Sequence, residues 1–505
     1  MNGIPRSSGS SRKLRSITRF WAVQVAALTL TLGTLVHAQN PPSAAPDGLS
    51  ELVEVLHANG AISQQQYDAL KKRLGAAPAA STLPPHELVE AEAPAREANP
   101  SATPNPKIIT MMDKGVGVHV GPVDVTVSGE INGFYDHDRV AKNPSEVVAG
   151  GLAGTGNTDS SAVRNGLLPG NFSINLATHQ MGYDIGVTFG FYPGLNSVSG
   201  VGGANSAGNP AALGTTGIDF RQQFATIGRS HLGTFKVGRD IGLFGQEAIL
   251  NDFSLLGVGS TGGNIAPSNT SLGRIGLGYV YTDFIPQITY TTPSASGFQA
   301  AVGVFTPLDA VDFSGLSGIL SAHDAPQFQG KLTYTSPDKH LAKVKLWTNV
   351  VTQSLQSNAS TQALAVGNGT QGTGLDYGGK LTAGGASLVA YGYYGWGLGT
   401  TGLFFDAVTP TGMKRNSDGY YVQGTYTFVK KFTLGGSYGV SHLSLASGEV
   451  NPDLLNNNAS EIGGARYKLT DWVNLVAEYT HTRSSAHSGN ADTSDSVAVG
   501  SILFF

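Results

Sequence analysis

Charged side chains that alternate with apolar ones are the residues of this sequence that could do chemistry. Lys343 and Lys345, for example, alternate with Val344 and Leu346. Successive side chains of a strand point to opposite faces, so both lysines would share one face, away from the apolar residues. The same reasoning selects candidates for a polar, lumen-lining face: Asp184, Lys331, Lys343, Lys345, Arg466, Lys468 and Glu478. A wall with more bases than acids would attract anions and would screen solutes by charge.

Catalytic patterns do not stand out. The histidines are scattered, no HExxH motif occurs, and the chain contains no cysteine. A His442-Leu443-Ser444 stretch is too common a pattern to indicate a phospholipase pair. We therefore expect no catalytic residues, no metal site and no cofactor, and we predict that the protein is not an enzyme.

Sixteen segments have the composition and periodicity of strands and would position these charges. Tyr183, Ile185, Val187 and Phe189 show the clearest period of two. The predicted strands are 116–137, 170–180, 182–192, 217–230, 232–242, 283–292, 297–306, 326–336, 341–354, 373–384, 385–397, 417–429, 431–445, 458–470, 472–484 and 494–505.

The connections between these segments alternate in length. Joins such as 179–182 and 470–472 are short, whereas 138–169, 193–216 and 398–416 are long, and the first two of these are rich in Gly, Asn and Ser. Short turns at one end and long loops at the other are typical of transmembrane β-barrels, whose alternating strands hide their hydrophobicity from averages. The sequence thus predicts an all-β protein, a sixteen-stranded antiparallel transmembrane β-barrel with a short N-terminal periplasmic helical segment.

Residues before the barrel divide into three predicted parts. Residues 1–38 have a basic start and an apolar core that ends at Val36-His37-Ala38, which is typical of a cleaved signal peptide. Residues 39–74 contain heptad-like apolar spacing and predict either a trimeric coiled coil or a helical hairpin interrupted near Gly60. Residues 75–107 form a linker rich in Pro and Ala, and 108–505 form the barrel.

Overall charge excludes one class of partner. The chain has 35 acidic and 31 basic residues, and five of the basic ones precede residue 38. The mature protein is therefore acidic, and we do not expect it to bind nucleic acid.

The final strand carries the first resemblance to a known family. Val497, Val499, Leu503 and Phe505 share one face, and the chain ends on that aromatic residue. This stretch resembles the terminal strand of Gram-negative outer-membrane barrels. The resemblance implies an outer-membrane location, contact with membrane lipids, and recognition of Phe505 as an assembly signal by the barrel-insertion machinery.

A second resemblance lies in residues 221–242, RQQFATIGRSHLGTFKVGRDIG. They resemble the hairpin before the constriction loop of sixteen-stranded general porins, which are trimers of water-filled channels. By this resemblance Arg221 and Arg239 would be arginines of the channel wall, and Glu247 and Asp252 would be acids of the constriction loop. Arg239 shares its face with Phe235 and Val237 by strict alternation, so a bulge or glycine kink must turn it inward.

The loop at 243–270 contains more apolar residues than an external loop needs. We expect it to fold into the lumen; the alternative is that it covers the barrel mouth or a neighbouring subunit. The resemblance implies a homotrimeric porin for passive diffusion of small hydrophilic solutes, with a preference for anions of the dicarboxylate type. The competing hypothesis is a non-conducting barrel that acts as a phospholipase-type enzyme or an adhesin.

Overall fold

The computed structural model describes residues 64, 68, 71, 109–112, 116–141, 147–153, 158–198, 215–264, 269–312, 320–337, 342–358 and 369–505. The chain forms two compact units, Met1–Ser101 and Ala102–Phe505. In the first unit the described residues Gln64, Asp68 and Lys71 are helical, and Gln64 Nε2 donates a hydrogen bond to Asp68 Oδ1 at 3.1 Å. The predicted signal peptide, the linker and the rest of the predicted coiled coil lie outside the described residues.

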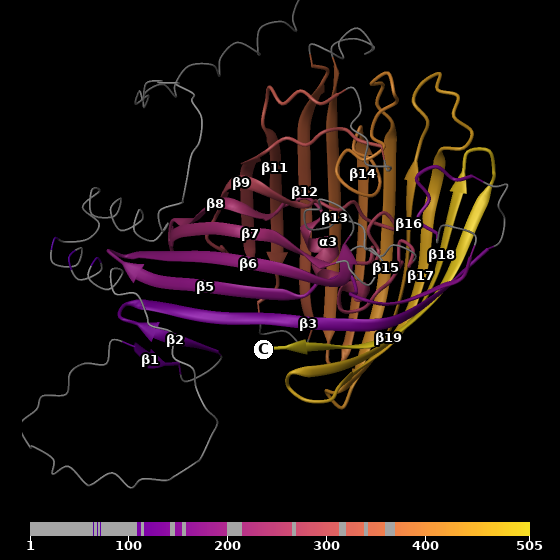
Figure 1. The fold of residues 1–505 in the computed structure, drawn as a ribbon. Coiled ribbons are helices and arrows are strands. Elements are labelled where there is room, and N and C mark those ends of the chain that lie inside the picture. The colour runs from indigo at the N-terminus through magenta and orange to yellow at the C-terminus, as the bar shows by residue number, and fades with distance from the viewer. Residues whose placement is uncertain are drawn as a thin grey trace, which may run out of the picture. The chain divides into compact units, whose positions relative to one another are not determined.

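The second unit is a closed antiparallel barrel of sixteen strands, as the sequence predicts. The ring closes where the last strand pairs with the first barrel strand, Ser494 opposite Val140 and Phe504 opposite Glu130 (Figure 1). Its strands are β3 (Val123–Val140), β5 (Asn171–Gln180), β6 (Tyr183–Val198), β7 (Thr215–Arg229), β8 (Gly233–Ile241), β9 (Phe284–Thr291), β10 (Phe298–Phe305), β11 (Gln327–Thr335), β12 (Ala342–Gln356), β13 (Gly369–Ala383), β14 (Ala386–Trp396), β15 (Asn416–Phe428), β16 (Phe432–Leu443), β17 (Leu455–Lys468), β18 (Val473–Ala486) and β19 (Ala491–Phe504).

The first predicted strand, 116–137, differs from the structure. It is split by a turn at Gly121 and Pro122 into β2 (Val116–Val120) and the barrel strand β3. Gly121 adopts a positive φ of 59°, which glycine allows without steric cost, and Pro122 has no N–H for a ladder bond. Two short strands extend the sheet: β1 (Ile109–Met111) pairs with β2, and β4 (Ser160–Arg164) pairs with β3.

The end of the chain is joined to the start of the barrel. Phe505 and Gly129 exchange two backbone hydrogen bonds of 3.1 Å each. The Phe505 ring lies 6.5 Å from the ring of Phe172 and 6.3 Å from that of Trp472. These contacts leave the last residue paired and packed rather than frayed.

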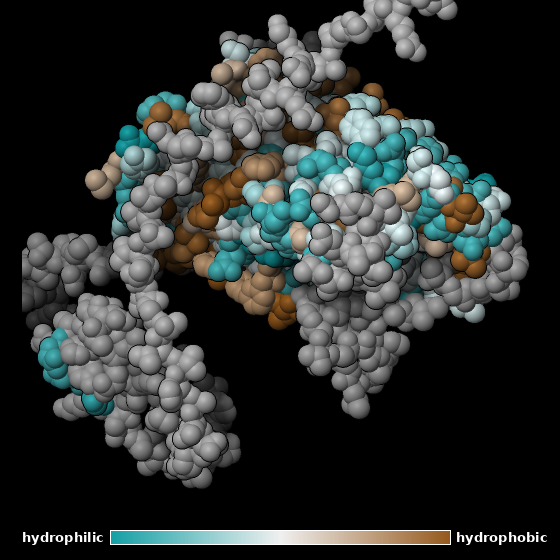
Figure 2. Space-filling view, turned by 90° about the horizontal axis from the view of Figure 1, so that it is seen from above, coloured by the Kyte–Doolittle hydropathy of each residue, from teal (hydrophilic) through white to brown (hydrophobic). Residues whose placement is uncertain are grey.

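Alternation separates the two faces of the wall. On β12 the even positions Leu346 and Val350 are 48% and 50% exposed, whereas the odd positions Trp347 and Val351 are buried. The exposed apolar positions face outward, and the buried positions face the interior of the ring. Figure 2 looks onto the barrel from above, where hydrophilic side chains gather in the middle and hydrophobic ones at the flank.

The segment between β8 and β9 fills part of that interior. It contains helix α3 (Gln246–Asn251) and the 3₁₀ turn η1 (Phe253–Leu256), and α3 lies inside the ring (Figure 1). Among the described residues, no helix is both long enough and apolar enough to cross a membrane.

Candidate functional site

The inner loop, residues 242–283, is fastened to the wall by hydrogen bonds to its backbone. Gln329 Oε1 on β11 accepts from the N–H groups of Leu243 at 2.6 Å and Phe244 at 2.8 Å. Asp376 Oδ2 on β13 accepts from Gly245 N at 2.7 Å. Because these buried N–H groups have partners on two wall strands, the start of the loop is held inside the barrel. The predicted inward folding of this loop is therefore what the structure has.

Apolar packing secures the loop against one side of the wall. Phe244 and Tyr279 of the loop are fully buried against strands β12 to β15. The cluster also takes in residues 398–408 and includes Phe244, Ala248, Ile249, Tyr279, Trp347, Val351, Tyr391, Leu398, Phe404 and Tyr421. This packing closes part of the cross-section, so the aqueous path must pass beside the cluster.

Glu247 of α3 faces two lysines of the wall. Its carboxylate lies 2.5 Å from Lys345 Nζ on β12 and 3.5 Å from Lys331 Nζ on β11. The Glu247 side chain is 6% exposed, that of Lys331 is 18% exposed and that of Lys345 is 36% exposed. Lys331 also donates to Gln246 Oε1. The structure therefore brings together one predicted loop acid and two predicted lumen lysines.

Asp252, the other predicted loop acid, points into the loop itself. Its carboxylate accepts from Ser254 N at 2.9 Å and Ser254 Oγ at 2.8 Å, and it caps η1. The Tyr279 hydroxyl donates to it at 3.0 Å. Because Asp252 is buried and satisfied by these donors, it shapes the loop and does not face the lysines.

Arg466 and Glu478 also contact the loop from the inner wall. The Arg466 guanidinium lies 4.2 Å from the centre of the Phe253 ring and donates to the Phe253 carbonyl. Glu478 is buried and accepts from Val258 N at 3.2 Å and from Gly259 N. Both residues face inward as the alternation predicts, but they hold the loop rather than line open water.

The two predicted wall arginines lie on different faces. The Arg221 side chain is 12% exposed, bonds Asp219 at 2.9 Å and lies over the rings of Tyr192 and Phe284. A shift in register between β6 and β7 occurs beside it. Arg239 is exposed on the outward face that it shares with Phe235 and Val237, and it pairs in regular register with Gln223. The expected inward turn of Arg239 is corrected, because no bulge interrupts β8 there.

Three further candidates lie near the turn end of the strands. Asp184 pairs with His179 at 2.8 Å and is 73% exposed. Lys468 pairs with Asp471 at 2.8 Å, and this hydrogen bond lowers the pKa of the Asp471 carboxyl below its ordinary value. Lys343 is exposed two positions before Lys345 and on the same face. These residues border the short-turn mouth rather than the narrow part.

Two further lysines, absent from the predicted lumen residues, also face inward. Lys236 pairs with Asp240 on β8 and lies 4.9 Å from the centre of the Phe224 ring. Its alternation with Phe235 and Val237 could have found it. Lys380 on β13 donates to Asn251 Oδ1 of α3 at 3.2 Å. Its opposite parity to Leu375, Tyr377 and Leu381 could have found it as well.

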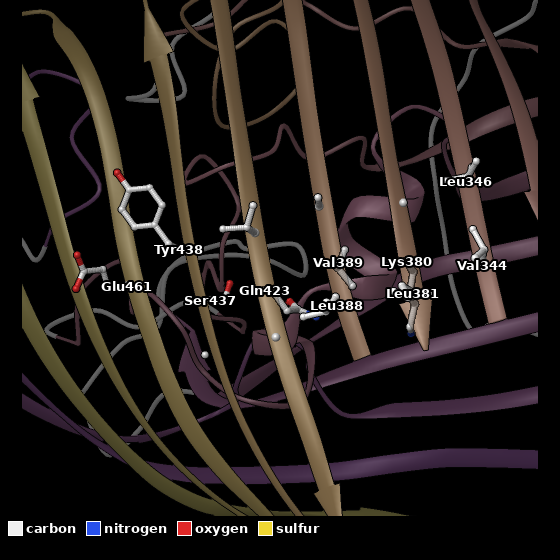
Figure 3. Close-up of a pocket in the computed structure, with 15 residues that line it drawn as sticks. Val344, Leu346, Lys380, Leu381, Leu388, Val389, Gln423, Ser437, Tyr438 and Glu461 are labelled. Atoms are coloured by element: carbon white, nitrogen blue, oxygen red, sulfur yellow. The ribbon is translucent and has the colours of Figure 1, made fainter. Parts of the chain in front are cut away.

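A groove of about 800 Å³ lies on the opposite, outward side of the wall (Figure 3). Exposed Leu346, Leu388 and Val422 border it, with Tyr438 and Glu461 at one end. Glycines at outward positions of β13, β15 and β16 leave the backbone uncovered there. Because its walls are the membrane-facing residues, this groove is not part of the path through the barrel.

The arrangement of charges inside the barrel can screen solutes by their charge. Among the described residues, no three His, Asp or Glu side chains are placed to hold a metal ion. Lys236, Lys331, Lys345 and Lys380 face the interior from β8, β11, β12 and β13, and the acids that pair with them are Asp240 and Glu247. The described inner wall below α3 therefore carries excess positive charge.

Comparisons with known proteins agree with this architecture. A family profile described as Gram-negative porin matches residues 110–487. The outer membrane channel DcaP of Acinetobacter baumannii is 15% identical, with a TM-score of 0.56 over 78% of this chain and 99% of that one. An anion-selective porin from Comamonas acidovorans is 13% identical, with a TM-score of 0.50 over 76% of this chain and 100% of that one. No curated protein matches the chain significantly by sequence.

Proposed function

The chain belongs to the Gram-negative porin family and is an outer-membrane diffusion channel, and we propose that this channel prefers small anionic solutes, dicarboxylates among them. The observation that carries the proposal is the excess of lysines on the inner wall below α3. Lys331 and Lys345 share the single carboxylate of Glu247, and Lys380 donates to the neutral side chain of Asn251. An excess of fixed positive charge lowers the barrier for anion entry.

Selectivity in this proposal arises in two zones. Arg221, held by Asp219 and two aromatic rings, lies toward the long-loop end of β7. The lysines lie below α3, where the loop narrows the path. Arg221 would screen solutes first, and the lysines would then set the sign of the preferred charge. Asp184, Lys343 and Lys468 would act only at the short-turn mouth.

The partners follow from the family. We propose that the protein is a homotrimer surrounded by outer-membrane lipids, and that Phe505 is read by the insertion machinery before it pairs with Gly129. The predicted helical prefix would assist trimer assembly if it forms a coiled coil. The similarity to an anion-selective porin supports the anion preference.

Single-channel conductance and the reversal potential in a KCl gradient test the proposed homotrimer and the proposed anion preference. Protein purified from outer membranes should give current steps in groups of three after insertion into a planar bilayer. Folding is checked by the change of gel mobility on heating. Steps that arrive singly would contradict the homotrimer, and a reversal potential that favours potassium would contradict the anion preference.

A further inference from the structure

Two of the inner lysines lie directly opposite each other in the sheet. Lys345 on β12 and Lys380 on β13 are Cα partners in the antiparallel register. Side chains at such positions are separated by about 5 Å between Cβ atoms, and like charges placed there repel each other. Both side chains face the interior, since Lys345 contacts Glu247 and Lys380 contacts Asn251, both in α3.

The described carboxylates around Lys345 and Lys380 do not neutralise the positive charge of both lysines. Glu247 is the one carboxylate bonded to Lys345, and it also serves Lys331. Asp376 lies on the same face of β13 four residues before Lys380, but it is buried and accepts from Gly245 N and from Asn349 Nδ2 at 2.6 Å. On β8, Lys236 forms a separate ion pair with Asp240. Three lysines against one facing carboxylate leave an excess of two positive charges.

We propose that Lys345 and Lys380 form a binding site for a small doubly charged oxyanion, a phosphate or a short dicarboxylate. The Lys345 side chain is 36% exposed, so a solute can reach it from water. An anion between the two ammonium groups relieves their repulsion and forms charge-assisted hydrogen bonds to both. Asn251 at the end of α3 adds a neutral polar neighbour. This site rests on the proposed anion preference and refines it, because two ammonium groups would favour a doubly charged anion over a singly charged one.

Saturable block of the chloride current tests the site. Phosphate and succinate are each titrated against the protein in a planar bilayer held in KCl. With the wild type, each should reduce the chloride current until the block saturates. The anion with the lower half-blocking concentration is the preferred ligand. Lys380→Gln leaves the Lys345–Glu247 pair intact, and it should raise the half-blocking concentration about tenfold, the loss of one charge-assisted bond. Lys468→Gln, at the turn, should leave it unchanged.

Different outcomes separate the site from the channel preference. A wild type that favours chloride over potassium but shows no saturation would overturn the site and leave the anion preference standing. Saturation that Lys380→Gln does not weaken would also overturn the site. A wild type that favours potassium would overturn the anion preference itself, and with it the site. If Lys380→Gln does not fold, Lys345→Gln should likewise raise the half-blocking concentration, and an unchanged half-blocking concentration would overturn the site.

Discussion

The inward face of β12 has two halves that differ completely. Toward the short turn, Lys343 and Lys345 are accessible, and Lys345 bonds the loop acid Glu247. Toward the long loops, Trp347 and Val351 are buried at 4% and 0% exposure in the apolar cluster of the inner loop. All four residues obey the same period of two. Alternation therefore decides which way a side chain points, and the loop decides whether it meets water or another side chain.

The buried half should respond most strongly to mutation. Trp347→Ala removes a large side chain from the cluster that holds the loop, and we expect it to destabilise the barrel by about 3–5 kcal/mol. Leu346→Ala is a matched control on the outward face, where the side chain is 48% exposed, and we expect under about 2 kcal/mol. Urea unfolding in lipid vesicles measures both. Equal losses would contradict the assignment of the two faces.

The charged half should change selectivity instead. Glu247→Gln removes the carboxylate between Lys331 and Lys345, so the anion preference should increase, and the unpaired lysines should cost about 1–3 kcal/mol. The outward Glu461→Gln is the matched control and should leave selectivity unchanged. Reversal potentials in a KCl gradient compare the two variants. An unchanged or reduced anion preference in Glu247→Gln would show that the lysines below α3 do not set it.

The smallest expected effect lies in the loop between β16 and β17, outside the strands. Burial acts to raise the pKa of Glu449, but the hydrogen bonds from Arg415 and from Ala446 N outweigh it and lower the pKa below its ordinary value. A carboxyl whose folded pKa is lowered stabilises the fold above its unfolded pKa, about 4.3. That stability is lost as the pH falls from there through the folded value.

Acid unfolding of Glu449→Gln measures this contribution. Wild type should lose part of its stability relative to the variant as the pH falls through that window. A difference between the two proteins that stays constant across the window would contradict a role for the Arg415–Glu449 pair. The wild type and the variant should have the same ion selectivity, because the Arg415–Glu449 pair lies away from the lysines of the inner wall.

Most of the fold was predictable because every strand of the barrel repeats the same alternation of outward and inward side chains. Segment 326–336 was predicted as a strand, and β11 runs from Gln327 to Thr335. The split at Gly121 was missed because apolar alternation continues on both sides of it. Arg239 was misplaced because the expected inward turn came from the resemblance, whereas its alternation with Phe235 and Val237 was correct.

The partners of the loop could not be read from the sequence. Glu247 and Lys345 are 98 residues apart, and Asp376 meets Gly245 across 131 residues. A periodic pattern identifies the inward face of each strand but carries no information about which loop atoms will reach it. Asp252 illustrates this most clearly, since its acidic side chain bonds its own loop.

The most direct test of the central claim is the reversal potential across a KCl gradient, for the wild type and for a variant with Lys331, Lys345 and Lys380 all changed to Gln. If these lysines set the anion preference, the wild type favours chloride, and the variant loses this preference while remaining folded and conducting. A wild type that favours potassium would contradict it. So would a folded variant whose reversal potential equals that of the wild type.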